Sequence, residues 1–330
     1  MVNKFKIVAI IEAIVIISLL VLLEIYYSSQ KPNNQQSLLA PKICSGLDEP
    51  KSFSILDFSP LQEEIQNYIG KSKHNISVYV KNYRNGAAMG INANYGYFPA
   101  SLNKLPVAIL VMEKIENGEL TLDTMLNITE ADRKNSSGDL YKTKEKKISV
   151  RVLLDKMLKE SDNTAFSVLL GNIDQNDLKL LLDYYGIDIY ANYHVKTFSI
   201  PSFNSYISPR LMYNVFSSLY FSTVLEPQNS QYILSRLTNT VFDLNKLANL
   251  PDNVVVSQKF GESYTGGNKY FHSCGIMYIG RSRIFYCIMT KGIPADEAKK
   301  AVGDITHNIF EYTVQTRAKL DQYKLYVENS

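Results

Sequence analysis

The segment FPASLNKLPVAILVMEKIENGEL, residues 98–120, begins like a loop and continues like a helix. Its apolar residues recur at intervals of three and four from Leu105 to Met112, which predicts a helix with one buried face. Ser101 and Lys104 stand three residues apart where this helix begins, so both side chains project from one side of its first turn. A serine hydroxyl becomes a good nucleophile when a nearby base takes its proton. Burial and the positive end of the helix dipole would keep the lysine amine neutral and make it that base.

The composition indicates a globular chain. It has 330 residues, a net charge of +3 and 45% hydrophobic residues, which suits one large domain or two closely packed ones. The nearly balanced charge does not suggest a basic surface that would bind nucleic acid. The histidines and the three cysteines lack metal-ligand spacing, so we expect no metal, no cofactor and no disulfide framework.

The amino terminus predicts a membrane anchor. Lys4 and Lys6 precede an almost unbroken apolar stretch at 7–23, whose length approaches that of a bilayer-spanning helix. A cleavable signal peptide, the competing interpretation, usually has a shorter apolar core and a small-residue cleavage site. The flanking lysines orient the chain with its amino terminus in the cytoplasm. We therefore predict a cytoplasmic stub and single-pass anchor at 1–27 and a flexible tether, rich in Ser, Asn, Gln and Pro, at 28–53.

The remaining chain has strand patterns at both ends and helical patterns between them. Alternating residues around Asn85 and Gly86 predict two strands and a turn, and three further strands are predicted near the carboxyl terminus. The helices are predicted at 61–69, 105–117, 150–159, 164–171, 177–185, 209–220 and 295–323. This order predicts a sheet lobe built from 54–98 and 252–330, with a helical lobe at 99–251 and a ligand cleft at their seam.

Two later triplets also carry polar residues at element boundaries. SDN at 161–163 lies between two predicted helices, where on its own it reads as a helix cap. KFG at 259–261 ends a predicted strand, and on its own it would only mark the end of that strand. Only their order after the Ser101 motif gives them further meaning.

In this order, SLNK, SDN and KFG resemble the S-x-x-K, S-D-N and K-T-G signatures of the serine β-lactamases and penicillin-binding proteins. The segments 98–123, 149–170 and 272–292 are similar to the matching helices and closing strands of the class A β-lactamase-like group, and the likeness covers about 54–312. It implies an α+β fold of the β-lactamase/transpeptidase type. This fold is an α/β sandwich in which helices flank an antiparallel sheet, with an inserted all-α subdomain. The resemblance also implies one catalytic domain at 54–330 that acts as a monomer.

The resemblance also implies catalytic roles. Ser101 is the acylated nucleophile, and Lys104 is its base or proton relay. Ser161 passes a proton toward the leaving nitrogen. Lys259 assists Ser161 and attracts the substrate carboxylate.

Three further residues are implied to bind the substrate. Asn163 holds the substrate's side-chain amide, and Gly261 leaves room for substrate beside the strand. The oxyanion is implied to lie between the backbone N–H groups of Ser101 and Glu262. Asp162, in contrast, is implied to stabilise the loop that presents its neighbours.

The third motif departs from the family pattern because Phe260 replaces its usual Thr or Ser. The missing hydroxyl removes a hydrogen bond to the substrate carboxylate that is worth about 1.5 to 3 kcal/mol, unless Ser257, Ser263 or Thr265 supplies one. Glu262 adds a negative charge beside an anionic substrate. Both changes argue against ordinary penicillin turnover.

A second departure lies in the stretch 186–209, where class A β-lactamases carry a Glu that activates the deacylating water. This stretch contains no Glu. His194 is its only evident titratable replacement, and a surface histidine is the simpler interpretation of that residue. General base catalysis contributes about a hundredfold to ten-thousandfold, so we expect a long-lived acyl-enzyme.

The sequence therefore predicts a serine hydrolase tethered to a bacterial cell membrane, with its catalytic domain outside the cytoplasm. Its expected partner is a β-lactam, whose amide bond it opens slowly, or a peptidoglycan peptide. One alternative is a D-alanyl-D-alanine peptidase acting on peptidoglycan stem peptides. Another is a non-catalytic β-lactam or cell-wall sensor.

Overall fold

The structure is a computed structural model that describes residues 17, 37–40, 57–70, 75–187 and 206–328, with side chains of the last helix described to 319. The chain divides into a unit at 1–37 and a compact unit at 38–330, and the fold below is that of the second unit. The predicted anchor at 7–23 lies outside the described residues, apart from Ile17. Among the described residues, no helix combines the length and apolar character needed to cross a bilayer.

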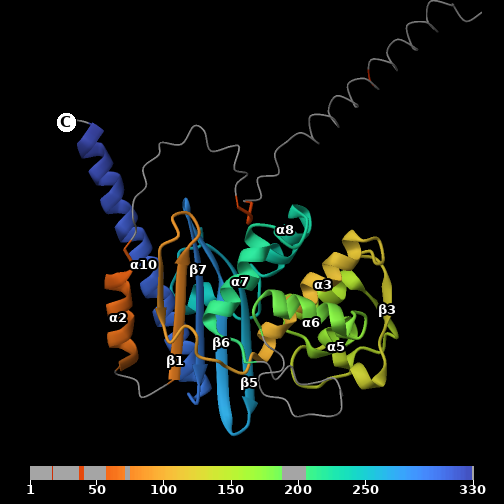
Figure 1. Cartoon of the computed structure of the whole chain (residues 1–330). Helices are drawn as coiled ribbons and strands as arrows, with labels where there is room; N and C mark the ends of the chain where they lie inside the picture. The colour runs from red at the N-terminus through yellow and green to blue at the C-terminus, as the bar shows by residue number, and fades with distance from the viewer. Residues whose placement is uncertain (1–16, 18–36, 41–56, 71–74, 188–205, 329–330) are drawn as a thin grey trace, which may run out of the picture. The chain divides into compact units, whose positions relative to one another are not determined.

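A five-stranded antiparallel sheet forms the centre of the domain, in the order β2-β1-β7-β6-β5 (Figure 1). Its strands are β1 (Asn75–Asn82), β2 (Ala88–Ile91), β5 (Val255–Thr265), β6 (Asn268–Ile279) and β7 (Ser282–Lys291). Because β1 pairs with β7, the two ends of the chain meet in one sheet, and the predicted fold class is confirmed. The strand that carries the third motif, β5, lies at an edge.

Helices cover both faces of this sheet (Figure 1). The helices are α2 (Ser59–Gly70), α3 (Lys104–Glu116), α4 (Val150–Lys159), α5 (Asn163–Leu170), α6 (Gln175–Tyr184), α7 (Pro209–Tyr220), α8 (Pro227–Arg236), α9 (Leu244–Leu247) and α10 (Ala295–Glu328). Short 3₁₀ turns, η2 (Ala100–Asn103), η3 (Glu130–Asp132) and η4 (Leu140–Lys142), and a small sheet of β3 (Met125–Asn127) and β4 (Lys147–Ser149) complete the described part. The small sheet, α8 and α9 have no counterpart in the predicted elements.

Two hydrophobic cores lie on opposite faces of the sheet. One packs α2, α9 and α10 against residues such as Val78 and Ile288. The other joins the helical lobe to residues such as Tyr79 and Phe285 on the second face. The predicted lobe boundary at 98–99 therefore runs through a continuous core, and the two lobes pack as one body.

Helix α3 corrects one expectation. Instead of one buried face, all nine residues from Lys104 to Met112 are buried. The reason is that α4, α5, α6 and α8 all contact this helix, so it runs through the centre of the helical lobe. A helix surrounded in this way must be apolar nearly all round, and the one charged side chain in the buried run is Lys104.

The described residues 38–40 pack against the domain although they fall inside the predicted tether. Leu38 is 4% exposed, and its carbonyl accepts a hydrogen bond from the Tyr278 hydroxyl at 2.7 Å. Its backbone N–H donates to the Gln231 side chain at 2.8 Å, and the N–H of Ala40 donates to the Tyr220 carbonyl at 2.8 Å. Leu38 and Ala40 are thus attached to the folded domain.

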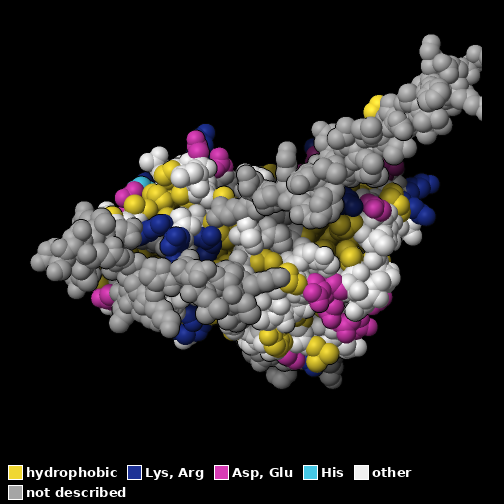
Figure 2. All heavy atoms as spheres, turned by 90° about the horizontal axis from the view of Figure 1, so that it is seen from above, with side chains coloured by type: hydrophobic (Ala, Val, Ile, Leu, Met, Phe, Trp, Pro, Cys, Tyr) yellow, Lys and Arg dark blue, Asp and Glu magenta, His cyan; other side chains and the backbone are white. Residues whose placement is uncertain are grey.

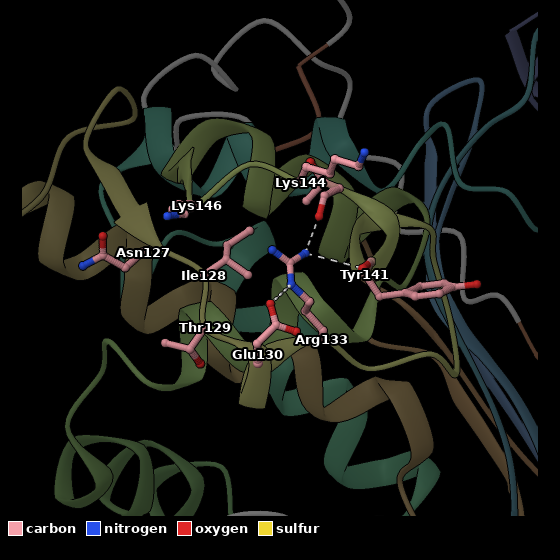
Figure 3. Close-up of a pocket in the computed structure, with 9 residues that line it drawn as sticks. Asn127, Ile128, Thr129, Glu130, Arg133, Tyr141, Lys144 and Lys146 are labelled. Atoms are coloured by element: carbon pink, nitrogen blue, oxygen red, sulfur yellow. Dashed lines mark hydrogen bonds and ion pairs between the residues drawn. The ribbon is translucent and has the colours of Figure 1, made fainter.

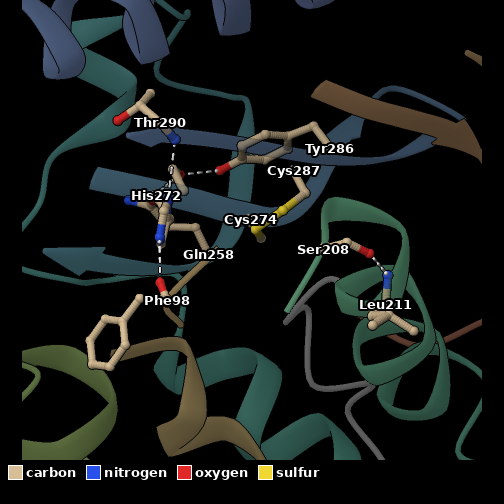
Figure 4. The surroundings of a disulfide bond; sticks show 10 residues. Phe98, Ser208, Leu211, Gln258, His272, Cys274, Tyr286, Cys287 and Thr290 are labelled. Atoms are coloured by element: carbon tan, nitrogen blue, oxygen red, sulfur yellow. Dashed lines mark hydrogen bonds between the residues drawn. A yellow bond between two sulfur atoms is a disulfide. The ribbon is translucent and has the colours of Figure 1, made fainter. Parts of the chain in front are cut away.

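The structure contains a disulfide between Cys274 and Cys287, contrary to our expectation from the cysteine pattern (Figure 4). The two cysteines lie directly opposite each other on β6 and β7, and both are fully buried. Sequence spacing alone did not suggest the pair, because only the strand register brings the residues together. Disulfides of this kind persist in oxidising compartments.

Replacing Cys274 and Cys287 together by alanine should lower the free energy of unfolding by about 3 kcal/mol, since the bond closes a loop of 13 residues. Chemical denaturation measures this change. Alkylation of the unfolded native chain should label one thiol without reductant and three with it, because the chain has three cysteines and two are paired. Three labelled thiols without reductant would contradict the bond.

Candidate active site

Ser101 lies in the 3₁₀ turn η2, directly before α3. Residues three apart are eclipsed in such a turn, which stacks the Lys104 side chain under Ser101. The Lys104 Nζ atom lies 3.0 Å from the Ser101 Oγ atom. Ala100, just before the serine, has a positive φ of 48°, a backbone conformation that is uncommon for a residue with a side chain. The serine and the lysine predicted to act together are therefore in hydrogen-bond contact.

The Lys104 amine is surrounded by oxygen atoms. Besides Ser101 Oγ, it contacts the carbonyl oxygen of Ser161, the Ser161 Oγ at 3.1 Å and the Asn163 Oδ1 at 2.6 Å. The residue is only 1% exposed. Burial lowers the pKa of Lys104 to about 7, and the nearby charge of Asp162 opposes that shift only in part.

These contacts orient the lone pair of the neutral amine. A neutral lysine has two N–H donors and one lone pair. The carbonyl of Ser161 and the Oδ1 of Asn163 can only accept hydrogen bonds, so they take both N–H groups. The lone pair is then left for a hydroxyl, and the Ser101 hydroxyl is 3.0 Å away. This is the geometry that proton removal from Ser101 requires.

Ser161 connects the two lysines of the site. Its Oγ lies 3.1 Å from Lys104 Nζ and 3.0 Å from Lys259 Nζ. Ser161 has a positive φ of 57° and is 1% exposed, so a strained turn between α4 and α5 holds the hydroxyl inside the protein. Burial, followed by the charge of Lys104, lowers the pKa of Lys259 well below its usual range. The hydroxyl can thus exchange protons with an amine on either side.

Asp162 has a structural environment, as the resemblance implies. Its side chain is fully buried, and each carboxylate oxygen accepts a backbone N–H, one from Ala165 at 2.8 Å and one from Leu140 at 2.9 Å. The first of these bonds caps α5. Gly138 packs so closely on this carboxylate that an added Cβ would lie 2.0 Å from it. Asp162 therefore fixes the loop rather than facing a substrate.

Asn163 is held from both sides of its amide. The Oδ1 accepts from Lys104, while the Nδ2 donates to Ser136 Oγ at 2.7 Å. The backbone N–H of Asn163 also donates to the Ser137 carbonyl at 3.0 Å. The amide that is implied to hold a substrate is thus already bonded to an exposed serine that the sequence analysis missed.

Gly261 allows β5 to approach the nucleophile. A Cβ at this position would lie 3.1 Å from the Ser101 nitrogen and 3.2 Å from the Pro99 carbonyl. Our expectation was that the glycine leaves room for substrate, but here the backbone of the nucleophile turn fills that space. The neighbouring Glu262 is exposed and forms an ion pair at 3.3 Å with Lys299 of α10, which offsets the negative charge expected at this point.

Phe260 packs into a row of aromatic rings. Its ring centroid lies 5.6 Å from that of Phe242, which contacts Phe271 at 5.1 Å. The Lys259 Nζ lies 4.5 Å from the Phe260 ring. The hydroxyl of Ser257 donates to the Leu234 carbonyl inside the protein, so this serine does not replace the hydroxyl missing at position 260.

His272 is a supporting residue that the sequence analysis did not identify. It lies opposite Gly261 on β6 and is fully buried. Its Nδ1 accepts the N–H of Thr290 at 3.3 Å, so its Nε2 carries the proton and donates to the Phe98 carbonyl at 2.9 Å (Figure 4). The histidine thus ties the segment just before Ser101 to the central strands. The available sequence signal was that His272 lies two residues before Cys274, so both side chains lie on the same face of the predicted strand.

Two other features lie apart from this cluster. His194, the possible replacement for the deacylating Glu, lies outside the described residues. A hollow in the helical lobe contains Thr129, Arg133, Tyr141 and Lys144 and none of the predicted site residues (Figure 3). Arg133 stabilises the backbone there, because its guanidinium donates hydrogen bonds to the carbonyls of Tyr141, Thr143 and Glu145.

Comparisons with known proteins agree with this fold. Residues 60–313 match the profile of a family described as the beta-lactamase enzyme family. PBP-A is 16% identical, with a TM-score of 0.69 over 78% of this chain and 97% of its own. A beta-lactamase from Chitinophaga pinensis is 17% identical (TM-score 0.68, 77% and 99%), and so is the TLA-1 extended-spectrum beta-lactamase (0.67, 77% and 98%). No curated protein sequence matches the chain.

His272 should make the fold sensitive to acid. Burial lowers its pKa from 6.5 to about 4, so between these values the unfolded chain binds a proton that the folded chain excludes. The free energy of unfolding should therefore fall by about 3 kcal/mol as the pH drops from 6.5 to 4, in addition to the effect of the carboxylates. Urea titrations of the native chain and of His272→Gln measure this difference. Equal pH dependence in both chains would refute it.

Proposed function

Because the chain belongs to the beta-lactamase enzyme family, we propose that it is a serine hydrolase that is acylated at Ser101 and opens β-lactam amide bonds. The observation that carries this proposal is the Lys104 amine, 3.0 Å from the Ser101 hydroxyl and with a pKa near neutrality. Near and above pH 7, a large fraction of this amine is free to accept a proton. The structural neighbours of the chain include both PBP-A and beta-lactamases.

The acylation step follows from the hydrogen bonds. Lys104 takes the proton of Ser101 as its Oγ bonds to the carbonyl carbon of the substrate. The proton then passes through Ser161 to the departing nitrogen, with Lys259 stabilising the transfer from the other side. The oxyanion is proposed to lie between the N–H groups of Ser101 and Glu262, which is supported by the close approach of Gly261 to the Ser101 nitrogen.

Deacylation is proposed to be slow. The stretch 186–209 contains no Glu. Asp162, the carboxylate whose charge acts on Lys104, has an N–H group bound to each of its oxygens and is poorly suited to activate water. A persistent acyl-enzyme favours a second candidate, a D-alanyl-D-alanine peptidase acting on peptidoglycan stem peptides. A structure of the L158E mutant of the neighbour PBP-A is an acyl-enzyme complex with penicillin G.

The chain is further proposed to be a membrane protein with its catalytic domain outside the cytoplasm. The apolar stretch at 7–23 and the lysines before it support this orientation. The buried disulfide between Cys274 and Cys287 is a separate argument, because such bonds persist outside the reducing cytoplasm.

Penicillin G should add its full mass to the native chain and none to Ser101→Ala, because ring opening releases no fragment. Intact-mass spectrometry over time measures both formation and loss of the adduct. Loss over minutes, together with release of D-alanine from a D-alanyl-D-alanine peptide, would favour the peptidase. A chain that forms no adduct with any of a broad panel of β-lactams would instead be the non-catalytic sensor.

The acylation rate should rise as the pH increases through about 7, because deprotonation of Lys104 creates the base. Lys104→Arg keeps a positive charge that does not titrate in this range, so it should acylate about a hundredfold to ten-thousandfold more slowly and without that pH step. Stopped-flow measurement with a chromogenic cephalosporin tests this. An unchanged rate in Lys104→Arg would remove the lysine from the mechanism.

A further inference from the structure

One end of the sheet carries a concentration of positive charge that the catalytic site does not use. It is formed by the β1–β2 turn with its flanks (81–88), the β6–β7 turn (279–284) and part of α10 (313–317). These segments contain five basic residues and no Asp or Glu, in a chain whose net charge is only +3. We name the five residues the basic end: Lys81, Arg84, Arg281, Arg283 and Arg317.

Contacts between the three segments bring these residues together. The N–H of Tyr83 donates to the Arg283 carbonyl at 2.9 Å, and the Arg283 guanidinium donates to the Gly280 carbonyl at 2.7 Å. The Arg317 guanidinium of α10 lies against the same turn, because a Cβ on Gly280 would be 1.8 Å from its Nη1. In Figure 2, Lys and Arg side chains gather on the face seen from this end of the sheet.

Aromatic side chains lie among these cations. Phe221 at the end of α7 is 46% exposed, and its ring contacts that of Tyr83 at 5.4 Å. The Lys81 Nζ lies 4.6 Å from the Tyr213 ring. Of these rings, that of Phe221 is exposed and those of Tyr83 and Tyr213 are partly buried. An exposed aromatic ring beside lysine and arginine is typical of surfaces that rest in the headgroup layer of a membrane.

The chain also enters the domain at the basic end. Tyr278 donates to the Leu38 carbonyl, and the Arg283 guanidinium lies 5.2 Å from the Tyr278 ring. Only the eleven residues 28–38 separate the end of the predicted anchor from this point. Eleven residues span at most about 40 Å, which keeps Leu38 near the bilayer.

We propose that the basic end docks on the anionic lipid headgroups of the membrane that holds the chain. The inference rests on the membrane anchor proposed above. Each surface cation strengthens binding to an anionic leaflet about fivefold, and salt screens the attraction. Docking in this way turns the β5–β6 turn, at the opposite end of the sheet, away from the bilayer.

The test uses the full chain in vesicles with dansyl-labelled headgroups. The chain has no tryptophan, so Ala88→Trp, at an exposed position beside the basic end, provides a single fluorescent donor. Tyr264→Trp, exposed near the β5–β6 turn, is the matched control donor. Energy transfer from position 88 should exceed that from 264. It should rise when phosphatidylglycerol is added to phosphatidylcholine, and fall again in high salt.

Charge reversal then identifies the surface. Arg84→Glu with Arg281→Glu should lower the ratio of docked to undocked protein by about 25-fold or more, which removes the response to phosphatidylglycerol. Lys144→Glu with Lys146→Glu, exposed in the helical lobe, should keep the response. Equal responses in both pairs would overturn the proposal.

Two further outcomes separate the possible failures. If the chain washes off neutral vesicles in carbonate, the anchor is wrong. If it stays but position 88 shows no dependence on phosphatidylglycerol, the anchor holds and docking is refuted. Soluble polyphosphate at constant ionic strength provides a further check. If it abolishes the energy transfer, and the transfer shows no preference for phosphatidylglycerol, the lipid proposal is refuted and an anionic polymer is indicated as the partner.

Discussion

The buried amine of Lys104 is the constraint on which the rest of the site depends. It contacts two hydroxyls, an amide oxygen and a carbonyl oxygen, and it lies where a charge is costly. Its proton affinity is set by how tightly those oxygens exclude water. Asp162 fixes one side of this enclosure through two backbone N–H groups, and Gly261 closes another by bringing β5 against the nucleophile turn. His272 ties that turn to the centre of the sheet.

The chain combines the hydrogen-bonded cluster of Ser101, Lys104, Ser161 and Lys259 with a third motif that departs from the family pattern. Phe260 directs its ring toward Phe242, and Glu262 pairs with Lys299. The hydrogen bonds between Ser161 and its two lysines are present beside these changes, and the Phe260 ring lies 4.5 Å from the Lys259 Nζ atom. The proposed enzyme should therefore keep its acylation chemistry while binding small anionic substrates differently from relatives with a hydroxyl at this position.

The opposite ends of the sheet have different chemical characters. The end where residues 38–40 join the domain is rich in arginine and contains the exposed ring of Phe221, whereas the β5–β6 turn carries Tyr264 and two glycines. The proposed membrane-anchored enzyme would benefit from this difference, because docking at the basic end would leave the β5–β6 turn facing away from the bilayer. The chain entry point and the charge pattern favour the same orientation.

Features encoded by local spacing could be predicted from the residues alone. The spacing of Ser101 and Lys104 placed them on one turn, and the alternation of strand residues predicted a sheet built from both chain ends. Three features followed from the fold and not from the local pattern: α3 is buried on every side, Cys274 faces Cys287, and His272 supports the nucleophile turn. The physical reason is that periodicity shows which face of an element is apolar, whereas strand register and the partners covering each face arise from contacts between distant segments.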